Sequence, residues 1–113
     1  MARKAFLIIL SEQNKGRRFP LTSDVYSCGR SLKNDISVND PFLSKKHCEF
    51  KKTMSGSYLL VDLGSKNGTF VNGKTVRFLE LKNHDIITIG SVQLLYLYEK
   101  NLNLATYDTA CIT

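Results

Sequence analysis

The sequence predicts an all-β protein, a sandwich of two antiparallel sheets. Short segments in which apolar and polar residues alternate dominate the chain, for example at Ile36 and Val38 or at Cys48 and Phe50, and this period of two indicates strands with one buried face. Glycines separate the segments, which follow one another at intervals of about 8–12 residues, as is typical of sandwiches and barrels. Helical periodicity is almost absent. The loops of such a sandwich collect at its two ends.

The elements are expected in a regular order along the chain. Strands are predicted over residues 6–10, 18–21, 25–28, 35–38, 47–52, 58–63, 69–71, 85–89 and 92–98. The first is an apolar run after a basic start, and those that follow are rich in β-forming residues or alternate. Asn67-Gly68 and Asn72-Gly73 enclose the short segment 69–71, and each dipeptide is expected to adopt left-handed backbone. Segment 92–98 is apolar on both faces, which suits a buried strand or a sheet that pairs with a second copy.

The length of 113 residues suits one domain with a single core. We expect this domain to occupy residues 1–100. Residues 101–113 have weak periodicity and are expected to form a C-terminal tail or the start of a linker.

Composition excludes several classes of protein. Apolar residues make up 42% of the chain, which excludes a disordered protein, and no apolar run approaches the roughly 20 residues of a membrane span. Secretion is not indicated either, because the apolar run near the N-terminus is too short for a signal peptide. The three cysteines are sparse and form no Cys-x-x-Cys pair, so the sequence predicts a soluble, intracellular protein.

The net charge of +6 favours anionic partners, and the loops between the expected strands carry groups that bind phosphate. Arg30 follows a strand and a glycine, and its planar donor fork matches two phosphate oxygens. Ser44 follows a proline turn and offers a hydroxyl, with Lys45 beside it as a second donor. Lys66 adds charge, while Asn67 offers a donor and an acceptor to a peptide backbone. Each residue taken alone also fits an ordinary surface or turn position.

Catalysis and metal binding are not expected. A hydrolase would pair Ser44 with His47, but strand-like spacing points their side chains to opposite faces, and no acid is placed to orient the imidazole. We expect the ring nitrogens of His47 to bond to backbone and to hold the loop of Ser44. His84 is expected in a turn, and the histidines and cysteines lack the spacing of a zinc site.

In order along the chain, four elements resemble the forkhead-associated (FHA) domain: Gly29-Arg30, Ser44-x-x-His47, the segment from Asp62 to Gly73, and the segment from Leu81 to Gly90. The ordered set is more specific than any one element. The resemblance implies an eleven-stranded β-sandwich that binds phosphothreonine peptides through loops at one end, without catalytic activity or cofactor.

The resemblance also implies residue roles. Arg30 and Ser44 would contact phosphate, Lys45 would assist, Lys66 would lie beside the phosphate, and Asn67 would bond the peptide main chain. Supporting roles fall to Gly29, His47, Gly68 and Asn72. Many family members have Thr or Ser in place of Lys66, and a lysine keeps the attraction but loses a directional hydroxyl bond. Phe42 lies where the family often reads the third residue after the phosphothreonine.

Two other functions stay open. Nucleic-acid binding would use Arg17, Arg18, Lys51 and Lys52, but it needs exposed stacking aromatics, and most aromatics fall in strand-like runs, so it is not expected. The main alternative is a self-associating scaffold, a homodimer with weak or lost phosphate binding. If a bound phosphothreonine joined two copies, Thr106 and Thr109 would be candidates for the modified residue.

Because FHA domains act mainly in nuclear signalling, the resemblance implies a location in the nucleus. It also implies a role in the DNA-damage response and the cell cycle, and residues 19–21 loosely resemble checkpoint-mediator scaffolds.

Overall fold

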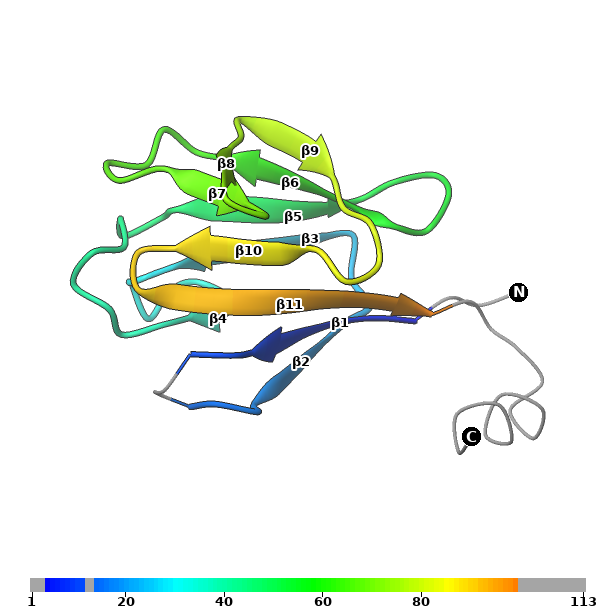
Figure 1. Cartoon of the computed structure of the whole chain (residues 1–113), viewed down its shortest axis with the longest axis horizontal. Helices are drawn as coiled ribbons and strands as arrows, with labels where there is room; N and C mark the ends of the chain where they lie inside the picture. Colours follow the sequence, from blue (N-terminus) through cyan, green and yellow to red (C-terminus); the bar gives the residue numbers. More distant parts are fainter. Residues whose placement is uncertain (1–3, 12–13, 100–113) are drawn as a thin grey trace.

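The computed structural model describes residues 4–11 and 14–99, and these form an all-β sandwich of two sheets (Figure 1). The predicted fold class is confirmed. The strands are β1 (Lys4–Ile9), β2 (Arg18–Leu21), β3 (Val25–Gly29), β4 (Ile36–Ser37), β5 (Cys48–Lys52), β6 (Tyr58–Asp62), β7 (Thr69–Val71), β8 (Lys74–Thr75), β9 (Phe78–Glu80), β10 (Ile86–Ile89) and β11 (Val92–Glu99). The expected tail, with Thr106 and Thr109, lies outside the described residues.

One sheet has six strands in the order β2-β1-β11-β10-β7-β8, and the other has five in the order β4-β3-β5-β6-β9. Neighbouring strands are antiparallel except for β3 and β4, which run parallel. The β3–β4 pair is thus the one parallel pair in two otherwise antiparallel sheets of the described residues. It consists of two short pairings, Cys28 with Ile36 and Gly29 with Ser37, formed where the chain returns after residues 30–35.

Two strands, β8 and β9, were not predicted. All their residues are exposed, so neither shows the alternation that marks a half-buried strand. The chain nevertheless pairs there, because β8 completes a two-residue hairpin with β7 through Asn72 (φ 51°) and Gly73 (φ 84°). The left-handed backbone expected for this dipeptide is confirmed.

The core lies between the two sheets and is built from the alternate side chains that point inward. Its largest members are Tyr58, Tyr96 and Phe50, each no more than 1% exposed. This packed core fixes the positions of the strand ends, and these in turn determine where each loop begins and ends. The described residues include no helix long and apolar enough to span a membrane.

The loops sort to two ends of the sandwich. The β3–β4, β4–β5 and β6–β7 loops and the β10–β11 turn lie together at the left-hand end in Figure 1. The β5–β6 hairpin and the β9–β10 loop lie at the opposite end, where β1 begins and β11 ends. The predicted site residues all belong to loops or strand ends of the left-hand group, apart from Asn72 in the β7–β8 turn.

Candidate functional site

Three loops enclose an open hollow of about 690 Å³ at the left-hand end of the sandwich. They are the β3–β4 loop (residues 30–35), the β4–β5 loop (38–47) and the β6–β7 loop (63–68). The hollow is lined by Arg30, Pro41, Phe42, Leu43, Ser44, Lys45, Lys46, Lys66 and Asn67. Four of these residues are cationic and none is acidic. We call this the cationic hollow, and it contains all five residues that the sequence nominated for phosphopeptide binding.

Arg30 is held in place by its own backbone and side chain. Its N–H donates to the Ser44 carbonyl oxygen at 3.0 Å, and its side-chain Nε donates to the Leu43 carbonyl oxygen at 3.1 Å. A guanidinium has five N–H donors, so the Leu43 bond orients the group and leaves its two terminal nitrogens to bind an anion. This is the fork geometry that suits two phosphate oxygens.

The Ser44 hydroxyl joins two of the loops. Its Oγ accepts a hydrogen bond from the backbone N–H of Lys66 at 3.0 Å. Because the oxygen is the acceptor in this bond, the hydroxyl hydrogen is left to donate to another group. Lys66 therefore has two connections to the cationic hollow: its backbone positions the serine, and its side chain lines the wall.

Asn67 also crosses between the loops, since its Nδ2 donates to the Phe42 carbonyl oxygen at 2.7 Å. The sequence predicted left-handed backbone at both residues of Asn67-Gly68. Gly68 has it (φ 91°), but Asn67 is not among the described residues of positive φ, so that prediction is wrong for Asn67. Because Nδ2 is the donor in this bond, the amide oxygen of Asn67 is left as an acceptor.

His47 is fully buried beneath these loops. Its Nδ1 accepts the backbone N–H of Ser44 at 3.1 Å, so Nε2 carries the hydrogen and donates to the Gly68 carbonyl oxygen at 2.9 Å. The neutral ring thus joins the β4–β5 loop to the β6–β7 loop. It bonds the backbone of Ser44 rather than the hydroxyl, so it is not placed as a base for that hydroxyl.

Gly29 stands where the loops approach β3 most closely. A Cβ at this position would collide with the Lys45 carbonyl oxygen and would lie 2.9 Å from both Asn34 Nδ2 and His47 N. Only glycine leaves room there. Asn34, which sequence reasoning missed, donates from Nδ2 to the carbonyl oxygens of Ser31 at 2.9 Å and Lys45 at 2.6 Å, and so fastens the loop beside Arg30.

Asp62 is a second supporting residue that sequence reasoning missed. Its carboxylate accepts the hydroxyls of Ser65 and Thr69, each at 2.6 Å, and the N–H groups of Gly64 and Ser65 at 3.0 and 3.1 Å. Burial by itself raises the pKa of Asp62, but these bonds outweigh it and leave the pKa below its usual value of 3.8. The charged carboxylate therefore shapes the β6–β7 loop. The signal was an Asp with Gly two residues and Ser three residues later, a pattern typical of a turn bonded by the Asp side chain.

Asp40 has the same role in the β4–β5 loop. Its Oδ2 accepts the Ser91 hydroxyl at 2.7 Å and the Ser91 N–H at 2.8 Å, while Oδ1 accepts the Phe42 N–H at 3.1 Å. Burial raises its pKa, yet the Ser91 and Phe42 bonds bring the net pKa below 3.8. The loop that carries Ser44 is thereby tied to the β10–β11 turn.

Asn72, expected as a support, lies apart from the cationic hollow. Its side chain bonds Asp85 Oδ1 at 2.9 Å and the Ile86 N–H at 3.0 Å. It therefore holds the β7–β8 turn against the start of β10.

A smaller hollow of about 300 Å³ adjoins the cationic hollow. It is lined by Phe42, Asn67, Phe70, Gly90 and Ser91, so Phe42 and Asn67 belong to both. We call it the apolar hollow, because two aromatic rings face it and no charged residue does. A ligand held by the cationic hollow could continue across Asn67 into it.

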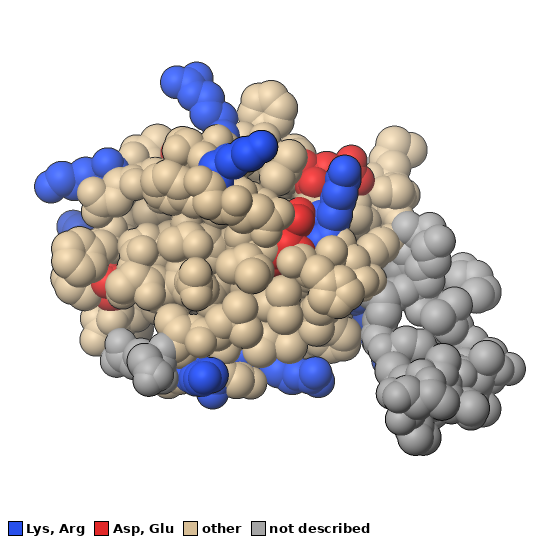
Figure 2. All heavy atoms as spheres, in the orientation of Figure 1, with Lys and Arg blue, Asp and Glu red and all other residues tan. Residues whose placement is uncertain are grey.

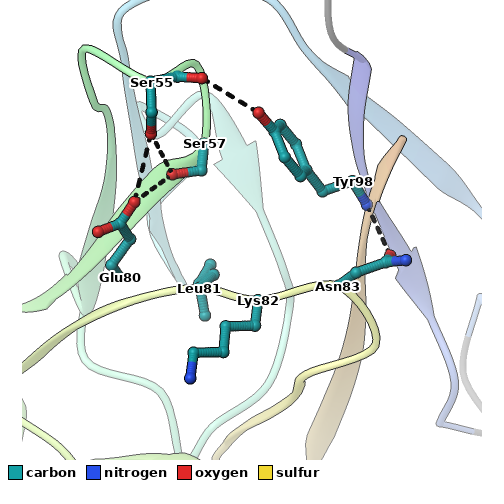
Figure 3. Close-up of a pocket in the computed structure, with 7 residues that line it drawn as sticks. All are labelled: Ser55, Ser57, Glu80, Leu81, Lys82, Asn83 and Tyr98. Carbon is teal, nitrogen blue, oxygen red and sulfur yellow. Dashed lines mark hydrogen bonds between the residues drawn. The ribbon is translucent and has the colours of Figure 1, made fainter. Parts of the chain in front are cut away.

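The opposite end of the sandwich has a different character. Figure 3 shows a hollow there in which the polar groups bond to one another. The Ser57 hydroxyl donates to Glu80 Oε2 at 2.6 Å, and the Tyr98 hydroxyl donates to the Ser55 carbonyl oxygen at 3.1 Å. Glu80 and Lys82 both line this hollow, so the hollow itself has no cationic surplus. No cluster of His, Cys, Asp or Glu that could hold a metal ion occurs within residues 4–11 and 14–99.

Comparisons with known proteins show what the chain is similar to. The model of the FHA domain family matches residues 26–90. The glycogen accumulation regulator GarA of Mycolicibacterium smegmatis is 38% identical over 93 residues, which cover 82% of this chain and 58% of GarA. The oxoglutarate dehydrogenase inhibitor of Corynebacterium jeikeium is 37% identical over 93 residues, covering 82% of this chain and 64% of that protein. The chain thus spans less than two thirds of either relative.

Solved structures agree on the fold. An FHA domain from a structural and functional analysis of phosphothreonine-dependent FHA domain interactions superposes with a TM-score of 0.78 at 26% identity, over 88% of this chain and 99% of that one.

The relatives overturn one expectation that came with the resemblance. The predicted location in the nucleus is wrong, because these relatives come from bacteria, which have no nucleus. A role in DNA-damage checkpoints and the cell cycle finds no support either, since the relatives are named as a regulator of glycogen accumulation and an inhibitor of a metabolic enzyme.

Proposed function

Because the chain belongs to the FHA domain family, we propose that its cationic hollow binds phosphothreonine in a partner protein and so mediates a phosphorylation-dependent protein–protein interaction. The observation that carries this proposal is the convergence of Arg30, the Ser44 hydroxyl and three lysines on one hollow that no acidic residue lines. A phosphate dianion supplies the negative charge that these cationic residues lack. Charge-assisted hydrogen bonds of about 1.5–3 kcal/mol each would provide most of its affinity.

The roles of the individual residues follow from their contacts. Arg30, oriented by Leu43, grips two phosphate oxygens, and the Ser44 hydroxyl donates to a third. Lys45 and Lys66 add attraction as point charges. The Asn67 amide oxygen accepts a main-chain N–H of the peptide beside the phosphothreonine. Gly29, His47 and Gly68 keep the three loops in register.

The apolar hollow defines a preference in the flanking sequence. We assign this hollow to the side chain of the third residue after the phosphothreonine, and Phe42 and Phe70 form its walls. An aliphatic or aromatic residue at that position buries apolar surface, at about 25 cal/mol per Å². A charged residue there would lose its hydration without gaining a partner.

Threonine is preferred over serine for a physical reason. Burying its extra methyl group is worth about 0.8 kcal/mol, and its branched Cβ restricts the side chain to fewer rotamers before binding. The two effects together give a modest preference for phosphothreonine. The phosphate contributes equally to the affinity for phosphothreonine and for phosphoserine, so it does not discriminate between them.

The relatives support a regulatory module rather than an enzyme. One is named as a regulator and one as an enzyme inhibitor, and His47 bonds the backbone of Ser44 rather than its nucleophilic oxygen. We therefore infer that this chain acts by binding a phosphorylated protein of bacterial metabolism. The alternative is a self-associating scaffold with weak phosphate binding, and the acid-free lining of the cationic hollow favours the phosphopeptide instead.

Calorimetric titration tests the proposal. Three peptides of one sequence are compared, with Thr, phosphothreonine or phosphoserine at the central position and leucine three residues later. We expect micromolar affinity for the phosphothreonine peptide, weaker binding of the phosphoserine peptide and no measurable binding of the unmodified one. Equal heats from the phosphorylated and unmodified peptides would refute the proposal.

A further inference from the structure

The cationic hollow carries more positive charge than one phosphothreonine can balance. Arg30, Lys45, Lys46 and Lys66 line it, together with no acidic residue. A phosphothreonine at pH 7 has a charge of about −1.5 to −2, so with the phosphate bound roughly two positive charges would remain without a counter-charge in the hollow. Figure 2 shows Lys and Arg side chains that project from the left-hand end of the molecule, where the three loops lie.

The acidic residues of the surrounding loops do not supply this counter-charge, because their carboxylates are bonded elsewhere. Asp40 and Asp62 accept the hydrogen bonds described above, which hold their own loops in shape. Asp35 Oδ2 accepts the N–H of Ser27 at 2.9 Å and its hydroxyl at 3.2 Å. Among residues 4–11 and 14–99, the ion pair between side chains lies on β5, and none of the four cations of the hollow takes part in one.

Lys46 is the cation of the hollow that the proposed phosphate contacts do not use. Arg30 and Lys66 are each joined to Ser44 by a backbone N–H, which donates to the Ser44 carbonyl oxygen and to its Oγ respectively, both at 3.0 Å. Lys45 directly follows Ser44 in the chain. Lys46 lies one residue further along the β4–β5 loop, and its exposed side chain still lines the hollow. Its ammonium group is therefore available to a second anion of the same ligand.

The apolar hollow indicates the direction in which the second anion lies. Phe42 and Asn67 line both hollows. Lys45 and Lys46 line the cationic hollow alone, and the Lys45 carbonyl oxygen accepts the Ser31 N–H at 3.1 Å, which ties this side of the hollow to the β3–β4 loop. Residues after the phosphothreonine cross to the apolar hollow, so residues before it lie toward Lys46. An extended peptide advances about 3.3 Å per residue, so three residues span about 10 Å.

We propose that Lys46 selects ligands with a second anionic group within the three residues before the phosphothreonine. This inference rests on the proposed function, which sets the place of the phosphate and the direction of the peptide. The second group is the carboxylate of an Asp or Glu or another phosphate, since an ammonium group pairs with either as a point charge. The ligand class is thus an acidic or doubly phosphorylated segment. A lysine at the same position is disfavoured by repulsion between like charges.

Fluorescence anisotropy of the full chain with a set of labelled phosphothreonine peptides provides the test. Glutamine fills the three positions before the phosphothreonine in the reference peptide, and each is exchanged in turn for glutamate, lysine or phosphoserine. We expect glutamate in at least one of these positions to tighten binding about threefold, as for an exposed ion pair, and lysine to weaken it. Phosphoserine, with its larger charge, should tighten binding more than glutamate does. Glutamate two residues after the phosphothreonine should give no comparable gain.

Two further peptides separate the sources of the signal. One carries glutamate before an unmodified threonine, and it shows whether the acidic residue binds without the phosphothreonine. The other carries phosphoserine before an unmodified threonine, and it shows whether the phosphoserine itself occupies the phosphate site. Both are expected to bind far more weakly than the corresponding phosphothreonine peptides.

Matched variants locate the contact through the ratio of the affinities for the glutamate and glutamine peptides. Lys46→Ala should bring this ratio to about one, because the cation that distinguishes the two peptides is gone. Lys52→Ala removes the same charge from an exposed residue at the far end of β5, and it should keep the ratio of the parent chain. Lys46→Glu should reverse the preference, so that the lysine peptide binds more tightly than the glutamate peptide. Such a reversal would not arise from unfolding.

Three outcomes overturn the proposal. Phosphate-dependent binding with equal affinity for glutamine and glutamate at all three positions would leave the proposed function standing and remove the second anion. A gain that survives Lys46→Ala, or that is as large when glutamate follows the phosphothreonine, would attribute the preference to the general positive charge of the chain. Absence of phosphate-dependent binding by every peptide would refute the proposed function and this inference with it.

Discussion

At the scale of single residues, the candidate site depends on how firmly Arg30 is held before a ligand arrives. Its side chain already donates to the Leu43 carbonyl oxygen at 3.1 Å, so binding costs less side-chain entropy than it would for a freely rotating arginine. Lys45 lines the same hollow, but its ammonium group can contribute only as a flexible point charge. The two cations are therefore unequal.

We predict that Arg30→Ala weakens phosphothreonine-peptide binding about tenfold to a hundredfold, as expected for one or two charge-assisted bonds of about 1.5–3 kcal/mol. Lys45→Ala should cost several-fold at most. Arg30→Lys keeps the charge but not the fork, and should fall between them. Calorimetry of the three variants against one peptide provides the comparison, and Arg30→Ala binding as well as the parent would contradict it.

At the scale of elements, the β6–β7 loop takes its shape from a carboxylate. Asp62 accepts four hydrogen bonds from Gly64, Ser65 and Thr69, and they hold its pKa below the usual value despite the opposing effect of burial. A carboxyl with a lowered pKa in the folded state stabilises the protein above its unfolded pKa, and this contribution disappears as the pH falls through the folded pKa.

The stability of the parent chain should accordingly decline as the pH is lowered below about 4, the usual range of an Asp carboxyl. Asp62→Asn should be less stable than the parent at pH 7, and its loss of stability on acidification should be smaller, because one titrating group is gone. Urea unfolding from pH 7 down to pH 2.5 measures both. Parallel curves for parent and variant would show that Asp62 does not contribute to the acid sensitivity.

The elements also show what sequence can and cannot predict. The alternation of apolar and polar residues located every strand that has a buried face, and the segments between these strands were predicted as loops. It missed β8 and β9, where all residues are exposed. Arg30 and Ser44 were nominated because their residue types suit phosphate. Asn34 and Asp40 were missed because their importance lies in contacts with loops distant in the sequence, at Lys45 and Ser91, which no local pattern records.

At the scale of the whole molecule, the distribution of charge decides how the protein attracts its ligand. The cationic hollow, lined by four basic residues and no acidic one, attracts its ligand by charge. The net charge of +6 adds a general attraction for anions. Salt should therefore weaken ligand binding at the cationic hollow.

Raising the ionic strength from about 0.05 to 0.5 M shortens the Debye length from more than 10 Å to less than 5 Å. We expect this to weaken phosphothreonine-peptide binding roughly tenfold, mainly through Lys45, Lys46 and Lys66, which are exposed. Leu95→Glu, on the six-stranded sheet, should leave this affinity within about twofold of the parent at each salt concentration. Fluorescence anisotropy of a labelled peptide measures both, and salt-independent affinity would argue against the electrostatic account.

The most direct measurement is an amide chemical-shift titration of the full chain with a phosphothreonine peptide. The account predicts that the largest shifts fall in residues 29–31, 44–47 and 65–68, the three loop segments that the hydrogen bonds of Arg30, Ser44 and His47 join. The unmodified peptide should cause none. Phosphate-dependent shifts located instead at the β5–β6 hairpin end, or no shifts at all, would contradict it.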